Sequence, residues 1–215
     1  MLEECGFDYA VHPVDIGNGG QFESAFGAIS PNNRIPALVD HAAGGDSGGD
    51  TGDNVPLAIF ESGAILVYLA ERTGRFLPTG ARGRLDVLQW LFWQIGGLGP
   101  MAGQLGHFLH SASAPDEYAI ERYRTEHHRL LGVLDRRLAD REFVAGEYSI
   151  ADIASWPWVR SAAGVRQSLD EFPHLQRWSA TVAARPAVQR GIGVGADWWV
   201  ARERVADAPS PSEGD

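Results

Sequence analysis

The sequence contains one cysteine, Cys5, among 215 residues. A single cysteine cannot form an internal disulfide bond, so the chain fits a reducing cytoplasm. Basic residues are also few: 18 Lys and Arg stand against 28 Asp and Glu, a formal net charge of −10. This balance argues against nucleic acid or an anionic membrane surface as a general partner. No apolar run approaches the length of a transmembrane helix, and no signal-peptide pattern opens the sequence.

The remaining composition is that of an ordinary soluble globular protein, with 44% hydrophobic and 21% charged residues. A chain of this length can form one large domain or two small ones and can bury a sizeable core. Tryptophan is abundant, and most of its seven copies lie between Trp90 and Trp199, where we expect a helical core.

Short strands are predicted in the first third of the chain, at Tyr9–Ile16, Ala37–Asp40 and Leu57–Phe60. Pro13 places the first of them at a sheet edge. The residues before it resemble the end of a helix that stops at Gly6, and residues 21–29 form a weak helix or a loop. Asp46, Asp50 and Asp53 lie in a segment rich in Gly and Asp at residues 42–54; their spacing does not match a helix-loop-helix calcium site, which favours a flexible insertion between strands.

From Ser62 onward, apolar residues recur at helical spacing. One helix is predicted to begin at Ser62 and end at Thr73-Gly74. Two longer apolar stripes follow, at Leu85, Leu88, Phe92 and Ile95 and at Tyr123, His127, Leu130, Leu134 and Leu138. Glycines between residues 96 and 103 interrupt the first stripe at a cost of about 1 kcal/mol each relative to Ala, which predicts a kink or a close approach of two backbones.

Helix boundaries in the last third are marked by specific residues. Ser149 and Asp152 have the spacing of a capping box. Pro173 suits the first turn of a helix whose inward residues are Leu175, Trp178 and Val182, and Pro186 ends that helix and can begin another. An α/β domain followed by an all-α domain is therefore predicted. We place them at residues 1–77 and 84–203, with a linker at 78–83 and a disordered tail at 204–215.

Residues 30–40 and 57–65 form two halves of one feature. A polar turn runs into a strand through Pro36, which has no amide and suits a tight turn with a cis bond. The second strand ends at Glu61-Ser62, where a helix begins. Ser62 is predicted to be the N-cap of that helix, and the free amides just after it would attract a carboxylate. On these features alone, a β-hairpin followed by a capped helix is the simpler interpretation.

The same residues resemble the glutathione site of glutathione transferases. The motif Asn-Arg-Ile-Pro-Ala-Leu occupies residues 33–38, and Phe-Glu-Ser-Gly-Ala-Ile-Leu-Val-Tyr-Leu-Ala-Glu occupies residues 60–71. A third stretch, residues 88–101, resembles the Nu-class bacterial enzymes, relatives of which act as disulfide-bond reductases. The resemblance runs from Met1 to about Arg190. It implies a thioredoxin-like domain followed by a helical bundle.

The resemblance also implies roles for individual residues. Ile35, beside a cis Pro36, would pair its backbone with the cysteinyl part of glutathione. Glu61 would face the α-ammonium of the γ-glutamyl end, and Ser62 its carboxylate. Further contacts are implied for Gln21, Arg34 and Arg122. By residue type alone, both arginines are solvated side chains and Asn33 is a turn former.

Other reactive residues favour structural interpretations. A lone Cys5 on a short helix is more often a buried small hydrophobe than a redox thiol, and Nu-class relatives do not use a cysteine nucleophile. Histidines with possible metal spacing occur at His107, His110, His127 and His128. His127 and His128 lie beside Glu126 in the sequence. No third ligand is indicated, so scattered surface or core histidines are the better interpretation.

The sequence departs from the family pattern at its start. Family members begin with a strand and a turn that carries Thr and Asn, and these two residues contact the glutathione sulfur. Met1 falls near the end of the following helix, so about 15–20 residues of that pattern are not in the sequence. Either the protein begins upstream of Met1, or the short chain is real and catalytically impaired. We favour the first, because losing a central strand leaves two rows of unpaired backbone groups.

The expected function is therefore that of a glutathione-dependent enzyme, with reduced or oxidised glutathione as cofactor. It would reduce small disulfides, conjugate electrophiles, or both. We also expect a homodimer, because Trp90, Phe92 and Trp93 offer more apolar surface than one amphipathic helix can hide. The alternative is a non-catalytic glutathione-binding or dimerisation module, since the residues that would activate the thiol are not in the sequence.

Overall fold

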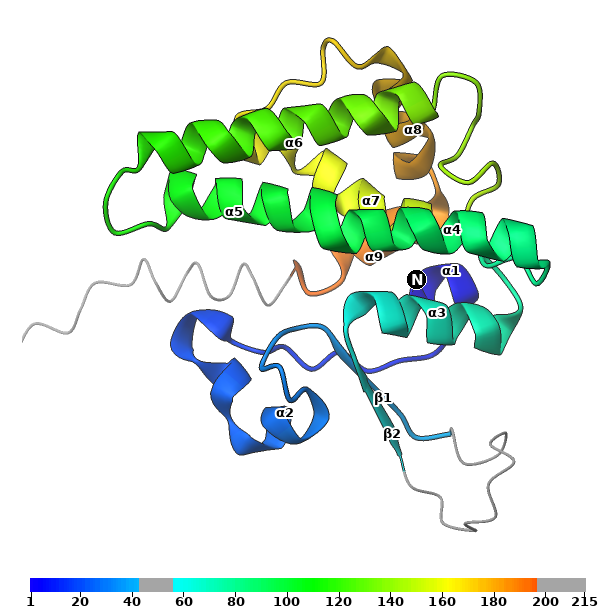
Figure 1. The fold of residues 1–215 in the computed structure, drawn as a ribbon. Coiled ribbons are helices and arrows are strands. Elements are labelled where there is room, and N and C mark those ends of the chain that lie inside the picture. Colours follow the sequence, from blue (N-terminus) through cyan, green and yellow to red (C-terminus); the bar gives the residue numbers. More distant parts are fainter. Residues whose placement is uncertain (43–55, 197–215) are drawn as a thin grey trace, which may run out of the picture.

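The computed structural model describes residues 1–42 and 56–196. Figure 1 shows a large helical body built from residues 81–183, above a smaller body that holds the N-terminal helices and the strands. The helix at Ser62–Thr73 lies between the strands and the large body, where it contacts the helix at Ile150–Arg160. The predicted tail at 204–215 and the aspartates Asp46, Asp50 and Asp53 lie outside the described residues. No helix in the described ranges is long and apolar enough to cross a membrane.

The smaller body is built on two antiparallel strands, β1 (Ala37–Asp40) and β2 (Leu57–Phe60), whose register pairs Ala37 with Phe60 and Asp40 with Leu57. Helices α2 (Ser24–Ile29) and α3 (Ser62–Thr73) both contact this sheet. Helix α1 (Leu2–Cys5) ends at Gly6, which has a φ of 71°. Both of these strands and the end of α1 are confirmed as predicted.

The prediction of a strand at Tyr9–Ile16 is wrong. Residues 7–15 have no regular structure, and Ile16–Asn18 forms a 3-10 turn. A strand is stabilised by hydrogen bonds to a neighbouring strand. Within the described residues the sheet consists of β1 and β2 alone, so this segment has no strand beside it. Val11 is accordingly half exposed, at 51%.

The helical body consists of α4 (Ala81–Trp93), α5 (Gly99–His110), α6 (Glu117–Arg137), α7 (Ile150–Arg160) and α8 (Pro173–Ala183). Helix α9 (Pro186–Gly193) follows α8 and contacts α1. The capping box of α7 is formed as predicted. The Ser149 side chain accepts a hydrogen bond from the backbone of the first turn, and the Asp152 side chain accepts one from the Ser149 amide. The inward face of α8 is also confirmed: Leu175 and Trp178 are fully buried and Val182 is 1% exposed. Residues 74–80 connect α3 to α4, so the linker placed at 78–83 extends three residues into α4, which begins at Ala81.

The glycine-rich join between α4 and α5 is a π-helical turn, Gln94–Leu98. A β-carbon on Gly99 would lie 2.7 Å from Nε2 of Gln94 and 3.0 Å from the ring of Trp158, so two elements approach closely there. The glycines therefore do disturb the helix, as predicted. The stripe assigned to α4 is not its buried face: Leu85 and Phe92 are 57% and 63% exposed, whereas Val87 and Leu91 are buried.

Candidate functional site

The turn before β1 is stabilised by hydrogen bonds between its own residues. Ser30 is fully buried, and its hydroxyl donates a hydrogen bond of 2.9 Å to the carbonyl of Arg34. The amide of Asn33 donates back to the carbonyl of Ser30 at 2.9 Å, and Asn33 itself has a φ of 53°. The Ile35–Pro36 peptide bond is cis. The hydrogen bonds of this turn hold residues 35 and 36 in place just before the start of β1.

The second half of the site is the junction of β2 and α3. Glu61 occupies the N-cap position with φ 68° and ψ 118°, a conformation that residues with a side chain adopt at some cost. Ser62 is the first helical residue, so the predicted cap is displaced by one residue. No side chain caps the start of α3 within the described chain. Its first amides, at the positive end of the helix dipole, are suited to binding a carboxylate.

The sheet register brings these two halves together. Ala37 pairs with Phe60. Ile35 and Pro36, which precede β1, therefore lie at the same end of the sheet as Glu61, which follows β2. Ile35 is 51% exposed, and Glu61 and Ser62 are also exposed. The site therefore presents a backbone segment, a carboxylate and a helix start on one accessible edge.

One contact across this edge was not predicted from the sequence. Nδ2 of Asn32 lies 3.3 Å from Oε1 of Glu61, to which it donates a hydrogen bond. The two residues are 29 positions apart, and the motif spacing gives no signal that links them. The two residues come together because β1 pairs with β2.

The other predicted residues are less tightly joined to this edge. Gln21 lies in the 3-10 turn Gly20–Phe22, half buried, and its Oε1 is buried without a hydrogen-bond partner in the described residues. Arg34 is exposed in the turn, and Arg122 is exposed on α6. No hydrogen bond or ion pair of the described chain joins Gln21, Arg34 or Arg122 to Glu61.

Helix α3 is anchored to the sheet at the far end of β1. The hydroxyl of Tyr68 donates to Oδ2 of Asp40 at 2.8 Å, and the guanidinium of Arg72 donates to the same oxygen. Burial disfavours the ionised Asp40, but the hydrogen bonds from Tyr68 and the Ala42 amide, with the charge of Arg72, outweigh it and hold the pKa of Asp40 below its usual value. This anchor fixes the helix whose start faces the site.

The candidate thiol and metal residues form no second centre in the described ranges. Cys5 is free and half buried, with Sγ 3.8 Å from Oγ1 of Thr73. No three His, Cys, Asp or Glu side chains of these residues gather as metal ligands. His127 is fully buried on α6, and neither ring nitrogen has a hydrogen-bond partner among the described residues. Burial, and then the charge of His128, lower the pKa of His127 to about 4.

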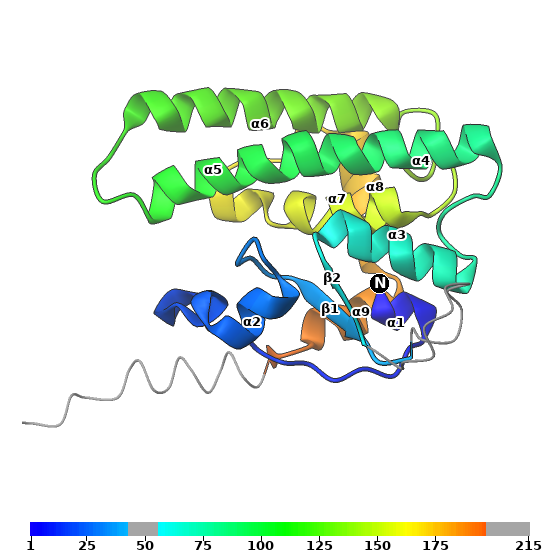
Figure 2. The same ribbon diagram turned by 60° about the horizontal axis from the view of Figure 1, so that its bottom comes forward.

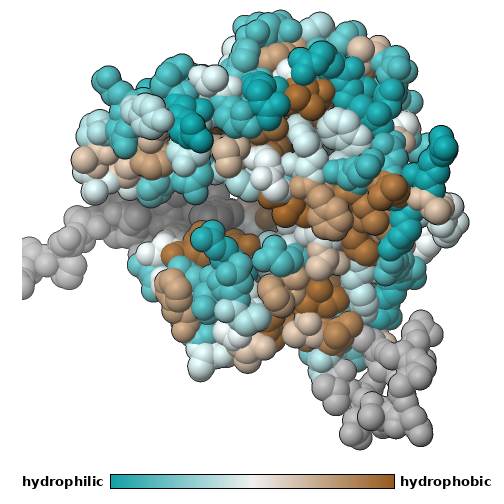
Figure 3. All heavy atoms as spheres, viewed as in Figure 1, coloured by the Kyte–Doolittle hydropathy of each residue, from teal (hydrophilic) through white to brown (hydrophobic). Residues whose placement is uncertain are grey.

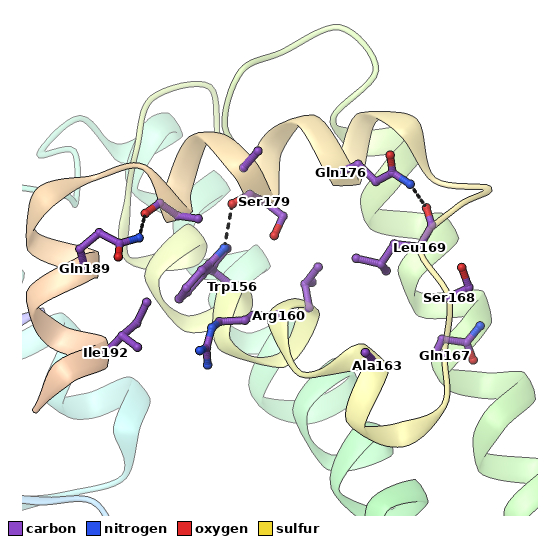
Figure 4. A pocket seen from close by; sticks show the side chains of 13 residues that line it. Trp156, Arg160, Ala163, Gln167, Ser168, Leu169, Gln176, Ser179, Gln189 and Ile192 are labelled. Carbon is purple, nitrogen blue, oxygen red and sulfur yellow. Dashed lines mark hydrogen bonds between the residues drawn. The ribbon is translucent and has the colours of Figure 1, made fainter. Parts of the chain in front are cut away.

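A separate groove of about 720 Å³ lies between α7, α8 and α9 (Figure 4). Nε1 of Trp156 donates across it to the carbonyl of Ser179 at 3.0 Å. Among the described residues that line the groove, Arg160 is the one with a charged side chain, and its guanidinium lies 5.8 Å from the centre of the Trp156 ring. None of the predicted site residues lines it, so the groove is distinct from the edge at Glu61.

Comparison with family models identifies both domains. The model "Glutathione S-transferase, N-terminal domain" matches residues 1–72, and the C-terminal domain of the same family matches residues 98–186. The disulfide-bond oxidoreductase YfcG of Escherichia coli is 51% identical over 193 residues, which cover 89% of this chain and 86% of that protein. The disulfide-bond oxidoreductase YghU of the same organism is 43% identical, over 89% of this chain and 68% of that protein.

Solved structures agree with these matches. A glutathione transferase from Burkholderia graminis, with two glutathione molecules bound per subunit, superposes with a TM-score of 0.79 at 44% identity, over 90% of this chain and 80% of that one. One from Pseudomonas putida, with one glutathione disulfide per subunit, gives 0.80 at 44% identity, over 90% and 84%. The predicted thioredoxin-like domain with a helical bundle is confirmed, as is an enzyme of the glutathione-transferase type. The chain belongs to the glutathione S-transferase family.

Proposed function

We propose that this protein uses glutathione to reduce small disulfides. The observation that carries the proposal is the edge where the uncapped start of α3 lies beside Glu61 and the Ile35–Pro36 segment. The relatives support it, since two are named disulfide-bond oxidoreductases and one structure holds glutathione disulfide. Conjugation of electrophiles by the same bound thiol is the second expected reaction.

The site residues fit the γ-glutamyl end of glutathione, which carries one ammonium and one carboxylate. Glu61 supplies a carboxylate for the ammonium, and Ser62 supplies a hydroxyl and an amide at a positive helix end for the carboxylate. Ile35 is exposed at the same edge, and its backbone is proposed to pair with the cysteinyl part. Gln21, whose buried Oε1 has no partner in the described chain, and Arg34 and Arg122 are proposed as further contacts.

Glutathione supplies the electrons. One glutathione thiolate attacks the disulfide, forms a mixed disulfide and releases the first substrate thiol; a second glutathione thiolate then attacks the glutathione sulfur of the mixed disulfide, which forms glutathione disulfide and releases the second substrate thiol. The chain's own residues contribute binding and orientation. Glu61 and Ser62 fix one end of the tripeptide, and Ile35 fixes its middle, so the sulfur is held at a constant place beside the sheet. Such positioning converts an encounter in solution into a reaction between oriented groups.

We further propose that the protein is a homodimer and acts in the cytoplasm. Apolar side chains gather over α4 and the body below it in the face of Figure 3, and Leu85 and Phe92 are 57% and 63% exposed on α4. Two exposed apolar residues seven positions apart lie on one helix face and are suited to packing against a second copy of the chain. The single cysteine is consistent with a reducing compartment.

Calorimetry with glutathione and an assay of a model disulfide test the function together. The wild-type protein is expected to bind glutathione and to reduce 2-hydroxyethyl disulfide with it. Glu61→Ala removes a charged partner and should weaken binding by about 1.5–3 kcal/mol. The matched control is Glu142→Ala, an exposed glutamate between α6 and α7, which should change neither property. Binding without turnover would instead identify a non-catalytic glutathione-binding module, and no binding would refute the proposal.

A further inference from the structure

We propose that Asn32 is a positioning residue for glutathione, which it serves by holding the Glu61 carboxylate toward the ligand's α-ammonium. The inference rests on the proposed function, because it assigns the ammonium to Glu61. Its basis is the hydrogen bond from Nδ2 of Asn32 to Oε1 of Glu61, at 3.3 Å. Asn32 acts through Glu61 and is not itself assigned a contact to the reacting atoms.

The turn that carries Asn32 is fixed on both sides. On one side, Ser30 is fully buried and its hydroxyl closes the turn onto the carbonyl of Arg34 at 2.9 Å. On the other, the amide of Asn33 bonds to the carbonyl of Ser30, also at 2.9 Å. Asn33 Oδ1 reaches α2, where it would lie 3.5 Å from a β-carbon placed on Gly27. The Asn32 amide thus projects from an anchored backbone.

Glu61 lacks comparable support of its own. Its side chain is exposed, and its backbone has φ 68° where most residues with a β-carbon avoid positive values. An exposed glutamate samples several rotamers, and binding an ammonium requires one of them to be fixed. The hydrogen bond from Asn32 fixes that rotamer before the ligand arrives, so the binding site is preorganised.

The chemistry of the amide suits this role. An asparagine donates a hydrogen bond without bringing a positive charge, so the full negative charge of Glu61 remains for the ammonium. A lysine or arginine at the same place would pair with the carboxylate and compete with the ligand. Arg34 is close in sequence, but no ion pair between Arg34 and Glu61 is found in the described residues.

The test uses two variants of Asn32 and two ligands. Asn32→Ala removes the donor, and Asn32→Ser keeps a residue common in turns but shortens the side chain beyond reach of Glu61. Both should weaken glutathione binding about threefold to tenfold, the effect of one lost hydrogen bond. Neither should weaken binding of glutaryl-cysteinyl-glycine, which is glutathione without its α-amino group. A merely structural defect would weaken both ligands alike and would refute the proposal.

A double-mutant cycle identifies the residue through which Asn32 acts. Asn32→Ala should have no further effect in a Glu61→Ala protein, because the acceptor that Asn32 orients is gone. Additive losses would overturn the inference. The matched control is Asn18→Ala, which removes a similar bond, from Nδ2 of Asn18 to Oδ2 of Asp15 at 2.7 Å, elsewhere in the smaller body. It should leave glutathione binding unchanged.

The outcomes separate this inference from the proposed function. If the wild-type protein does not bind glutathione, the proposed function fails. If it binds and Glu61→Ala loses affinity while Asn32→Ala and Asn32→Ser do not, the function stands and the role of Asn32 is refuted. Thermal midpoints measured for all variants show whether the turn remains folded.

Discussion

Glu4 and Arg185 join the two ends of the described chain. Oε1 and Oε2 of Glu4 accept hydrogen bonds from Nε and Nη2 of Arg185 at 2.7 and 2.9 Å, across 181 positions of sequence. The same guanidinium lies 3.6 Å from the centre of the Tyr148 ring. Only 8% of the Glu4 side chain is exposed. Figure 2 shows the result: α1 lies against α9.

This pair should stabilise the attachment of the smaller body. Glu4→Ala leaves the Arg185 charge half buried without its partner, which should lower the free energy of unfolding by about 1–3 kcal/mol, since 30% of the arginine is exposed and solvent screens part of the effect. Urea unfolding measures the change. The neighbouring pair of Glu3 with Arg190 is more open, with 57% of the arginine exposed. Glu3→Ala should therefore have the smaller effect; an equal or larger one would contradict the argument.

Acid should act on the fold through His127. Its pKa of about 4 in the folded chain lies below the ordinary value of 6.5, because burial disfavours the charged ring. The unfolded chain therefore takes up the proton first, so the stabilising contribution of neutral His127 is complete above pH 6.5 and falls as the pH drops from 6.5 to 4. The full difference corresponds to about 3 kcal/mol.

The check on His127 is the stability of a His127→Leu variant between pH 7.5 and 4. Leucine cannot titrate and leaves no unpaired nitrogen, so the variant should lose this part of the pH dependence while keeping its stability at pH 7.5 within about 1 kcal/mol. His12→Gln serves as the control, because His12 is exposed in the smaller body. An unchanged pH profile in His127→Leu would contradict the assignment.

Two glycines of the join between α4 and α5 should respond in opposite directions to alanine. A β-carbon on Gly99 meets Gln94 at 2.7 Å and the rigid Trp158 ring at 3.0 Å, whereas one on Gly96 meets nothing within 4 Å. Gly99→Ala should therefore destabilise the fold by about 1–3 kcal/mol, as overpacking does. Gly96→Ala should be neutral or stabilise it by up to about 1 kcal/mol through helix propensity. Thermal unfolding of both variants compares them directly.

Local signals predicted those elements whose ends depend on neighbours in sequence. Gly74 stops α3, Ser149 and Asp152 begin α7, and Pro173 begins α8, because caps and prolines act within a few residues. The segment at Tyr9–Ile16 has strand-like residues, but a strand also needs a partner that local pattern cannot supply.

Features that depend on packing could not be derived in this way. Helix α4 has apolar residues on more than one side, so periodicity alone could not show that Val87 and Leu91 face the core while Leu85 and Phe92 face outward. At the site, motif resemblance indicated Glu61. The hydrogen bond from Asn32 could not be foreseen, because it depends on strand register between segments 29 positions apart.

The outward face of α4 gives the final prediction, which concerns assembly. Leu85 and Phe92 are more exposed than core residues of a monomer should be, and burying both against a second copy removes apolar surface from water. Light scattering at micromolar concentration should report a dimer for the wild-type protein and a monomer for Leu85→Glu combined with Phe92→Glu, because two charges would be buried without partners. Phe22→Glu is the matched control: Phe22 is 71% exposed on the smaller body, and its replacement should leave the dimer intact. A wild-type monomer, or a dimer that survives the double substitution, would show that this face of α4 does not mediate assembly.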